Sequence, residues 1–253
     1  MRGRSREETY DLDLLRQSDD RWRLSAGLRA VYGGLYRAMA EQARLGPALE
    51  IGSGIGAIKR SLPDVVTSDV RETTFADRVV SAYDIESDAG GPWQTIYAMD
   101  VLHHLRDPFR FFESASRVLA PQGRIVMCEP AATGLGRRFY GAFHHEPIDL
   151  TVIPCPYAPP PTEEGVDFAN MAMAWALFVR DRASTQERLE ALNLTVCAVA
   201  FRDVIAYPAT GGFSGPTLLP AMGVRAVLAL ESLLPQWLLR RVALRMIVTL
   251  ERR

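Results

Sequence analysis

The sequence of 253 residues is poor in several features that would point to particular classes of protein. Its three cysteines, Cys128, Cys155 and Cys197, are scattered and lack the C-x-x-C spacing of a zinc site or the pattern of a disulfide framework. Lys59 is the only lysine, so arginine carries almost all the positive charge. No apolar run is long enough to span a bilayer, and the charged N-terminus lacks the apolar core of a signal peptide. We therefore expect a cytoplasmic protein in a reducing compartment.

Charge and apolar content are those of an ordinary globular domain. The net charge is −1 and 48% of the residues are hydrophobic, without the basic excess typical of nucleic-acid binding. We therefore expect a small-molecule partner and no nucleic acid. Near the C-terminus, leucines and Trp237 between Leu228 and Leu239 are followed by arginines, which favours a helix buried on a sheet or in a homodimer interface over a membrane contact.

Short apolar segments alternate with amphipathic ones along most of the chain. This alternation predicts a mostly parallel sheet with right-handed crossovers and helices on both faces. Strands are expected at the apolar run from Ala48, at Asp64–Val70, Asp77–Ile85, Thr95–Met99, Arg124–Cys128, Leu194–Phe201 and Leu244–Glu251. Helices are expected at Trp22–Ala43 with a division at Gly33–Gly34, at Ile55–Leu62, from Asp107 onward, within Ala131–Phe143, at Asp167–Arg180, and at Leu218–Arg240 with a break at Pro235. Irregular segments are expected at Asp88–Pro92, Pro154–Pro161 and Tyr207–Pro216, and the polar segment Met1–Asp20 is expected to be loose at its start.

These patterns divide the chain into four consecutive parts of a single domain. We expect residues 1–45 to form an N-terminal helical cap and residues 46–131 to form the cofactor-binding half of the core. Residues 132–192 are expected to be a cap or insert on the substrate side. Residues 193–253 are expected to add a C-terminal strand pair with a long helical insertion.

The stretch A-L-E-I-G-S-G-I-G-A, from Ala48 to Ala57, is the strongest signal in the chain. A short apolar run meets three glycines in five positions, which indicates a buried strand entering a turn where the backbone can approach a ligand closely. The segment after the glycines can begin a helix, whose N-terminal amide groups favour an anionic or polar group. The stretch therefore predicts a loop that holds the polar end of a nucleotide-like cofactor. The glycines alone also fit a dinucleotide fingerprint at Gly52, Gly54 and Ala57.

Acidic residues and a histidine pair stand where the following strands are expected to end. Asp69 ends the second strand, and because ligands of open α/β sheets lie at the carboxyl ends of strands, it can accept hydrogen bonds from a ribose diol. Asp84 ends the third expected strand. The run D-V-L-H-H-L begins at Asp100 after the fourth strand, and L-A-P-Q-G-R-I-V at Leu119 to Val126 leads into the fifth.

Together, these features resemble the class I S-adenosylmethionine-dependent methyltransferases of the small-molecule "type 11" group, over about Leu49 to Pro130. The resemblance implies an α/β, Rossmann-like sheet of seven strands in the order 3-2-1-4-5-7-6, with strand 7 antiparallel. It implies S-adenosylmethionine as cofactor, S-adenosylhomocysteine as product, and an acceptor such as a natural product, sugar or glycolipid. It also assigns roles to single residues. Glu50, Gly52 and Gly54 would face the methionine part of the cofactor, Asp69 would hold the ribose, Asp84 and Ile85 would flank the adenine, and Met99 and Asp100 would line the sulfonium end.

Three segments outside this resemblance are rich in aromatic residues. They are Trp22–Ala43, Phe143–Arg180 and Tyr207–Pro216. Because small-ligand pockets are largely apolar with few polar groups, we expect these segments to close over the substrate, although the aromatics would also serve to pack the core. The residues expected to bind substrate are Tyr140, Glu146, Asn170, Trp175 and Tyr207.

The four histidines come as two adjacent pairs, His103–His104 and His144–His145. Histidine is the side chain whose pKa best suits proton transfer near neutrality. The first pair follows the fourth strand, and the second has Glu146 beside it, so a carboxylate can orient an imidazole. We expect a histidine general base for an acceptor hydroxyl, with His144 or His145 favoured. We expect no metal, because adjacent side chains tend to diverge and nothing else has ligand spacing.

Other functions remain open at this point. Methylation of carbon or nitrogen on a small molecule uses the same scaffold. A nicotinamide-dependent oxidoreductase shares the glycine loop and the acid of the second strand, but Lys59 lies in the glycine-loop helix and no catalytic Tyr/Lys pair is evident. A non-catalytic binding protein on a methyltransferase fold is a further alternative. A nucleic-acid methyltransferase is disfavoured, since D-V-L-H stands where an N-P-P-[YFW] motif would follow the fourth strand.

Overall fold

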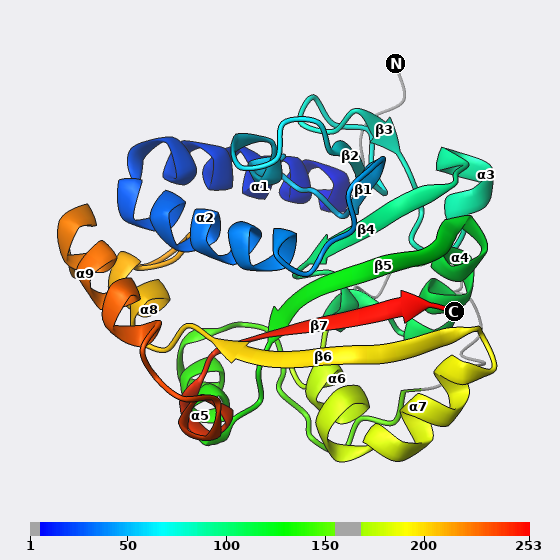
Figure 1. The fold of residues 1–253 in the computed structure, drawn as a ribbon. Coiled ribbons are helices and arrows are strands. Elements are labelled where there is room, and N and C mark those ends of the chain that lie inside the picture. Colours follow the sequence, from blue (N-terminus) through cyan, green and yellow to red (C-terminus); the bar gives the residue numbers. More distant parts are fainter. Residues whose placement is uncertain (1–5, 155–167) are drawn as a thin grey trace.

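The computed structural model of the protein describes residues 6–154 and 168–253, with side chains from residue 13 onward. Cys155 and nearly all of the expected proline-rich loop at Pro154–Pro161 lie outside these residues. The described chain forms a central sheet with helices on both faces (Figure 1).

The sheet contains seven strands in the order β3-β2-β1-β4-β5-β7-β6 (Figure 1). They are β1 (Ala48–Ile51), β2 (Val66–Asp69), β3 (Arg78–Val79), β4 (Trp93–Met99), β5 (Leu119–Pro130), β6 (Leu194–Arg202) and β7 (Arg245–Arg252). Neighbouring strands from β3 to β5 are parallel, whereas β7 is antiparallel to both β5 and β6. The predicted strand order and the antiparallel seventh strand are confirmed.

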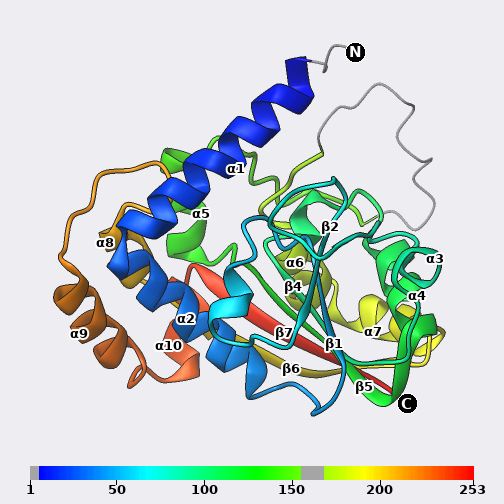
Figure 2. The same ribbon diagram turned by 90° about the horizontal axis from the view of Figure 1, so that it is seen from above.

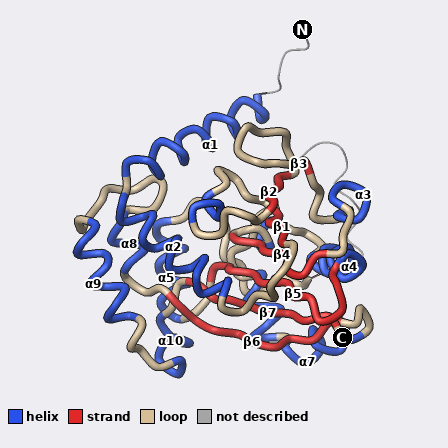
Figure 3. The backbone as a smooth tube through the Cα atoms, turned by 45° about the horizontal axis from the view of Figure 1, so that its top comes forward, coloured by secondary structure: helices blue, strands red, loops and turns tan. Residues whose placement is uncertain are grey.

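Helices surround this sheet, and Figure 3 shows the strands crossing the middle of the molecule between them. The α-helices are α1 (Arg6–Leu24), α2 (Ala26–Ala40), α3 (Ile85–Ala89), α4 (Pro108–Val118), α5 (Gly134–Phe143), α6 (Met173–Trp175), α7 (Arg182–Glu190), α8 (Ala206–Thr210), α9 (Ala221–Glu231) and α10 (Gln236–Val242). Two 3₁₀ turns, η1 (Ala57–Arg60) and η2 (Leu102–His104), and one π-helical turn, η3 (Ala176–Arg180), complete the set.

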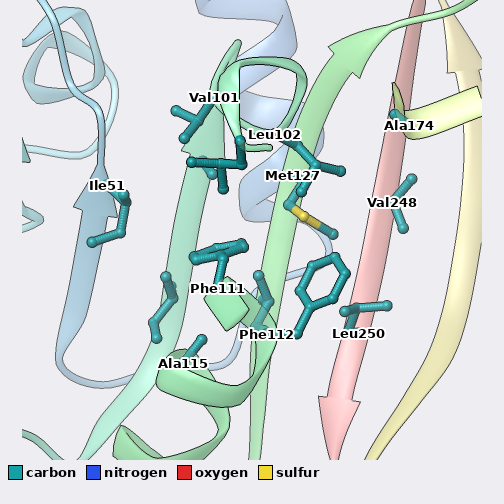
Figure 4. Close-up of a cluster of buried hydrophobic side chains, with 14 of the residues drawn as sticks. Ile51, Val101, Leu102, Phe111, Phe112, Ala115, Met127, Ala174, Val248 and Leu250 are labelled. Atoms are coloured by element: carbon teal, nitrogen blue, oxygen red, sulfur yellow. The ribbon is translucent and has the colours of Figure 1, made fainter. Parts of the chain in front are cut away.

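Alternating side chains of the central strands build two separate apolar layers. In β4, Tyr97 and Met99 pack with α2 and η1, whereas Ile96 and Ala98 pack with the opposite layer. That opposite layer contains α4 and the segment from α6 to α7, and Figure 4 shows Phe112 of α4 within its cluster. A strand covered on both faces is buried throughout, which explains why the parallel strands read as nearly continuous apolar runs.

The N-terminal segment differs from the expectation. Helix α1 forms from Arg6 within the polar segment whose start was expected to be loose, and α2 runs unbroken through Gly33–Gly34, where a division was expected. The break between the two helices falls at Ser25, where the hydroxyl accepts a hydrogen bond from the Leu28 N–H at 3.2 Å. An N-cap of this kind satisfies an otherwise unpaired amide at the start of a helix. Figure 2 shows α1 and α2 meeting at this point.

Three further expectations are wrong in detail. Strand β3 is much shorter than Asp77–Ile85, because the chain turns after Val79 and α3 begins at Ile85. The predicted turn at Asp88–Pro92 therefore starts inside a helix. Tyr207–Pro216 was expected to be irregular, but its first residues belong to α8. Helix α7 had no counterpart among the expected elements, since its sequence has little amphipathic pattern.

The C-terminal helices also expose more apolar side chains to solvent than expected. The break at Pro235 between α9 and α10 is confirmed. However, Leu233 is 78% exposed and Trp237 is 64% exposed in the single chain, while Leu239 is buried. Leu233 and Trp237 therefore do not pack on the sheet, whereas Leu228 and Leu234 are partly buried against the apolar clusters, and a homodimer interface there stays a prediction. Among the described residues, no helix is both long and apolar enough to cross a membrane.

Candidate functional site

The loop after β1 is held in a left-handed backbone conformation by glycines. Gly52, Gly54 and Gly56 have φ angles of +66°, +51° and +65°. A β-carbon on Gly52 would lie 2.5 Å from Cγ2 of Val101, so the fold itself requires glycine there. At Gly54, Leu15 alone among the described residues comes near, 3.9 Å from the position of a β-carbon. Gly54 therefore presents open backbone against which a ligand can lie.

Strand β2 fixes this loop from its other side. The Asp69 carboxylate accepts a hydrogen bond from the Gly54 N–H at 3.1 Å. The Ser68 hydroxyl donates to the Glu50 carbonyl at 2.7 Å, and the Ser53 N–H donates to the Ser68 carbonyl at 2.8 Å. The structure thus brings Asp69 to the glycines, as the prediction requires, while its contact with ribose stays a prediction.

Glu50 is a buried carboxylate at the end of β1. Its side chain is 1% exposed, and neither oxygen makes a well-formed hydrogen bond with any described residue. Burial raises the pKa of Glu50 to about 7, although Ser53 and the Tyr36 hydroxyl lie close enough to oppose the rise. A buried carboxylate without a partner is costly, so this position is suited to a cationic or hydrogen-bonding ligand group.

Asp84 and Ile85 do not match their expected places. Asp84 is exposed at the start of α3 and faces a hollow that it shares with Asp107 and Glu113, to which no glycine-loop residue contributes. Ile85 is fully buried in the apolar core, and its N–H donates to the Ser114 hydroxyl at 2.8 Å. The misplacement follows from the shortness of β3, which moves the strand end upstream of both residues.

Met99 and Asp100 end β4 beside the glycine loop. Asp100 has a φ of +58°, and its N–H donates to the Cys128 carbonyl at 3.0 Å. Its carboxylate pairs with the guanidinium of Arg245, which is 4% exposed and lies 5.3 Å from the ring centroid of Tyr207. Arg245 was not among the predicted site residues. It is the first residue of β7, and because β7 is antiparallel to β5, the start of β7 lies at the edge where the parallel strands end.

The turn after β4 is built on one buried carboxylate. Glu129 in β5 accepts hydrogen bonds from the N–H groups of Val101 at 2.9 Å, Leu102 at 2.8 Å and His103 at 3.3 Å. Its Oε2 also lies 2.7 Å from Nδ1 of His103. Because an ionised carboxylate only accepts hydrogen bonds, Nδ1 carries the hydrogen, and Nε2 is turned away from Glu129. Glu129 had no predicted role, since only the fold shows that it faces η2.

All four histidines gather around the Glu146 carboxylate. The nearest nitrogen of His103 lies 3.5 Å from a Glu146 oxygen, and those of His104, His144 and His145 lie at 3.6, 3.6 and 3.9 Å. Ring centroids are 4.2 Å apart in the first pair and 4.9 Å apart in the second. The expectation that adjacent histidines diverge is therefore wrong, because both rings of each pair turn to the same acid.

The histidines of this cluster differ in protonation. Burial disfavours a proton on His103, but Glu129 and Glu146 outweigh it and raise the pKa of His103 to about 10. Burial lowers the pKa of His104 and that of His144, so both are neutral near pH 7. Although burial acts to raise it, the pKa of Glu146 is lowered to about 2 by the surrounding histidines, His103 foremost.

The remaining predicted substrate residues are divided between this edge and other parts of the molecule. Tyr207 lies at the edge beside Arg245. Tyr140 is 1% exposed and its hydroxyl donates to the Leu244 carbonyl at 2.5 Å, while Asn170 is 4% exposed and holds the Asp149 backbone through two hydrogen bonds. Both side chains are therefore used by the fold. Trp175 packs on Phe201 of β6 at 6.1 Å between ring centroids and lines a hollow to which no glycine-loop residue contributes, so its contact with substrate stays a prediction.

The fold and this edge define a class of protein. A seven-stranded sheet in this order, a glycine loop after β1 with an acid after β2, and a cluster of polar side chains after β4 are the features of a class I methyltransferase. A family model described as "Methyltransferase domain" matches residues 26–194, well over half of the chain. The chain belongs to this family, and its cofactor is S-adenosylmethionine. This decides against the nicotinamide-dependent alternative.

Solved structures are similar in fold but distant in sequence. A S-adenosylmethionine-dependent methyltransferase from Archaeoglobus fulgidus is 13% identical, with a TM-score of 0.50, over 88% of this chain and 94% of that chain. The N-methyltransferase NodS from Bradyrhizobium japonicum, in complex with S-adenosylhomocysteine, is 14% identical, with a TM-score of 0.47, over 95% and 97% of the two chains. None of the curated proteins compared matches the chain.

The described residues fit the cofactor. The buried Glu50 carboxylate, which makes no well-formed hydrogen bond with a described residue, suits the amino group of the methionine part, and the open backbone at Gly54 leaves room for the ligand beside it. Asp69 lies next to both, where a diol can be bound. When bound, S-adenosylmethionine supplies a methyl group activated by a positively charged sulfur.

Proposed function

We propose that this protein methylates an oxygen atom of a small-molecule acceptor and that a histidine of the cluster removes the acceptor's proton. The observation that carries the proposal is the convergence of all four histidines on Glu146 beside the end of β4. A hydroxyl must lose a proton as it is methylated, whereas a neutral amine needs no base before attack. A dense group of imidazoles next to the cofactor edge therefore favours an oxygen acceptor.

His145 is the histidine best placed to act as the base. His103 has both ring nitrogens directed at carboxylates, and His144 accepts the Glu146 N–H on its Nδ1 at 3.3 Å. The side chain of His145 is 85% exposed, so an acceptor can reach it. Its Nε2 lies 3.9 Å from Glu146, close enough for the carboxylate to stabilise the imidazolium that forms.

Other residues of the edge would bind and orient the reactants. Glu50, Gly54 and Asp69 would hold the cofactor from the β1 and β2 side. Tyr207, whose ring lies against Arg245, would contribute an apolar wall with a polar rim to the acceptor pocket. In-line methyl transfer depends mainly on such positioning and on the exclusion of water. The balanced charge of the chain supports a small-molecule acceptor in a biosynthetic role, and the scattered cysteines support a cytoplasmic location.

The test begins with the acceptor itself. The protein is purified without added ligand, and copurified small molecules are identified by mass spectrometry, where S-adenosylhomocysteine together with a hydroxylated compound is the expected result. With that compound in hand, release of S-adenosylhomocysteine is measured for alanine variants of each histidine. His145→Ala should lower turnover by about 10²–10⁴-fold and leave cofactor affinity unchanged. Near-normal turnover in all four variants would show that no histidine is the base and would favour an amine acceptor.

A further inference from the structure

We propose that His103, His104 and Glu146 form a binding site for one divalent transition-metal ion, with zinc as the member of this class that fits best. The three side chains offer two imidazole nitrogens and a carboxylate oxygen, and these donor atoms all lie within 4.8 Å of one another. The binding of the ion depends neither on S-adenosylmethionine nor on the proposed acceptor.

Two separations in this cluster, one to each oxygen of Glu146, are close to those of ligands that share an ion. Nε2 of His103 and Nε2 of His104 lie 3.5 and 3.6 Å from the Glu146 carboxylate. Both distances are longer than a good hydrogen bond between nitrogen and oxygen. Two ligand atoms of a tetrahedral zinc ion, each bound at about 2.0–2.2 Å, are separated by roughly 3.3–3.6 Å. Side-chain rotations that bring these donors, now within 4.8 Å of one another, to that separation would place all three on one ion.

His103 is also oriented in the way that metal-binding histidines usually are. Its Nδ1 lies 2.7 Å from Glu129, which is fully buried and fixed by three backbone N–H groups of the turn after β4. This contact sets the tautomer and turns Nε2 toward Glu146. A carboxylate that holds the second nitrogen of a ligand histidine in this way is a regular feature of zinc sites and increases the basicity of the ligand.

The charge of the cluster favours a cation. Glu129 and Glu146 place two carboxylates on either side of His103, and Oε2 of Glu146 has no hydrogen-bond partner among the described residues although it is buried. Arg245, a positive charge near the cluster, is already paired with Asp100. A divalent ion bound between His103, His104 and Glu146 would therefore lie close to two carboxylates, those of Glu129 and Glu146.

The second histidine pair lies outside this ligand set. The lone pair on Nδ1 of His144 already accepts the Glu146 N–H at 3.3 Å. Nε2 of His145 is the most distant of the four from Glu146, at 3.9 Å, and its ring is 85% exposed. His145 is therefore a matched control, since it has the same side chain and faces the same carboxylate without serving as a ligand.

The donor set also selects the kind of metal. Two imidazoles with one carboxylate suit zinc and its neighbours in the transition series, whereas magnesium and calcium prefer oxygen ligands alone. Three protein ligands leave a fourth position open, as in catalytic zinc sites. The side chain of His104 is 45% exposed, so that position is reachable from solvent. If the proposed oxygen acceptor is correct, its hydroxyl is a natural fourth ligand, and this last step alone rests on the proposed function.

The experiment measures metal binding directly. The full-length protein is stripped with a chelator, dialysed, and titrated with Co²⁺ by visible absorption and with Zn²⁺ by calorimetry. One ion per chain is expected, with Co²⁺ bands of a site containing nitrogen ligands, and millimolar Mg²⁺ should not displace it. His104→Ala and Glu146→Gln should each weaken Zn²⁺ binding by at least about 100-fold, since even the loss of a residue that only supports a ligand typically costs 10–100-fold. His145→Ala should weaken it by less than about threefold, because His145 lies 3.9 Å from Glu146 and neither binds the ion nor hydrogen-bonds a ligand.

Circular dichroism and S-adenosylhomocysteine affinity verify that each variant is folded. Failure of the wild-type protein to bind Zn²⁺ would overturn the proposal, as would equal affinity in His104→Ala. An equal loss in His145→Ala would also overturn it, because the ion would then use a different ligand set. None of these results bears on the proposed methyl transfer, which is judged by the release of S-adenosylhomocysteine from the acceptor assay.

Discussion

Replacing Glu50 by glutamine should make the protein more stable and a poorer binder of its cofactor. Glu50 is 1% exposed, and burial raises its pKa from 4.5 to about 7. Because the Glu50 carboxyl binds its proton more tightly in the folded state than in the unfolded state, it stabilises the fold relative to the unfolded chain at low pH. This contribution to the free energy of unfolding is lost as the pH rises from about 4.5, the unfolded pKa, to about 7, the folded pKa. Because one pKa unit corresponds to about 1.4 kcal/mol, the ionised Glu50 costs about 3 kcal/mol of stability above pH 7.

Glutamine has nearly the same shape and stays neutral, so Glu50→Gln removes this pH-dependent cost. The free energy of unfolding of the ligand-free protein should rise by up to about 3 kcal/mol at pH 8, and the difference should disappear at pH 4. For a chain of this length, such a gain raises the melting temperature by roughly 6–12 °C. At the same time, loss of one charge-assisted hydrogen bond should weaken S-adenosylhomocysteine by about 1.5–3 kcal/mol.

Asp203 provides the control. Burial, with the nearby charge of Glu231, raises the pKa of Asp203 to about 7 as well, but this residue follows β6 at the opposite side of the sheet from β1. Asp203→Asn should therefore stabilise the protein above pH 7 and leave cofactor affinity unchanged. Chemical denaturation at pH 4 and pH 8 and calorimetry with S-adenosylhomocysteine measure both effects. If Glu50→Gln showed no pH-dependent gain, or bound the product as tightly as the wild type, the role given to this carboxylate would be refuted.

Two further substitutions test other parts of the site. Gly54→Ala places a side chain at a φ of +51° against the cofactor surface, so calorimetry should show a loss of S-adenosylhomocysteine affinity in addition to about 1–2 kcal/mol of backbone strain; unchanged affinity would show that the ligand does not lie against this glycine. Arg245→Met leaves Asp100 without its buried partner, so the free energy of unfolding should fall by about 3 kcal/mol, the lower end of the range for buried pairs, because the Asp100 side chain is 29% exposed. The double variant Arg245→Met, Asp100→Leu should recover most of that loss when both proteins are unfolded with denaturant. Equal instability of the single and double variants would contradict the ion-pair explanation.

The cofactor half of the site was predictable because it is local in sequence. Gly52, Gly54 and Asp69 lie on neighbouring strand ends that the alternation of apolar and polar segments already defines. The strand order followed from the family resemblance, since periodicity alone does not say which strands are neighbours. Asp84 was misplaced because a two-residue strand such as β3 leaves almost no period-two signal, and the end of the strand could not be located.

The acceptor side was predictable only as a list of residue types. The two histidine pairs are about forty positions apart, and nothing in their spacing shows that both turn to Glu146. The role of Glu129 depends on β5 lying next to β4, and that of Arg245 depends on the direction of β7. Tyr140 and Asn170 were taken as ligand contacts because polar aromatic and amide groups are common in pockets. Their hydrogen bonds to backbone show that buried polar side chains just as often serve the fold.

The close approach of Gly52 to Val101 has a consequence for how the parts of this edge move. Val101 leaves no room for a β-carbon on Gly52, and its own N–H is bound to Glu129, the residue that also holds His103. The glycine loop therefore cannot shift toward η2 without moving the turn that carries the histidines. Seating the cofactor in the loop would set the position of the histidine cluster through this short steric path.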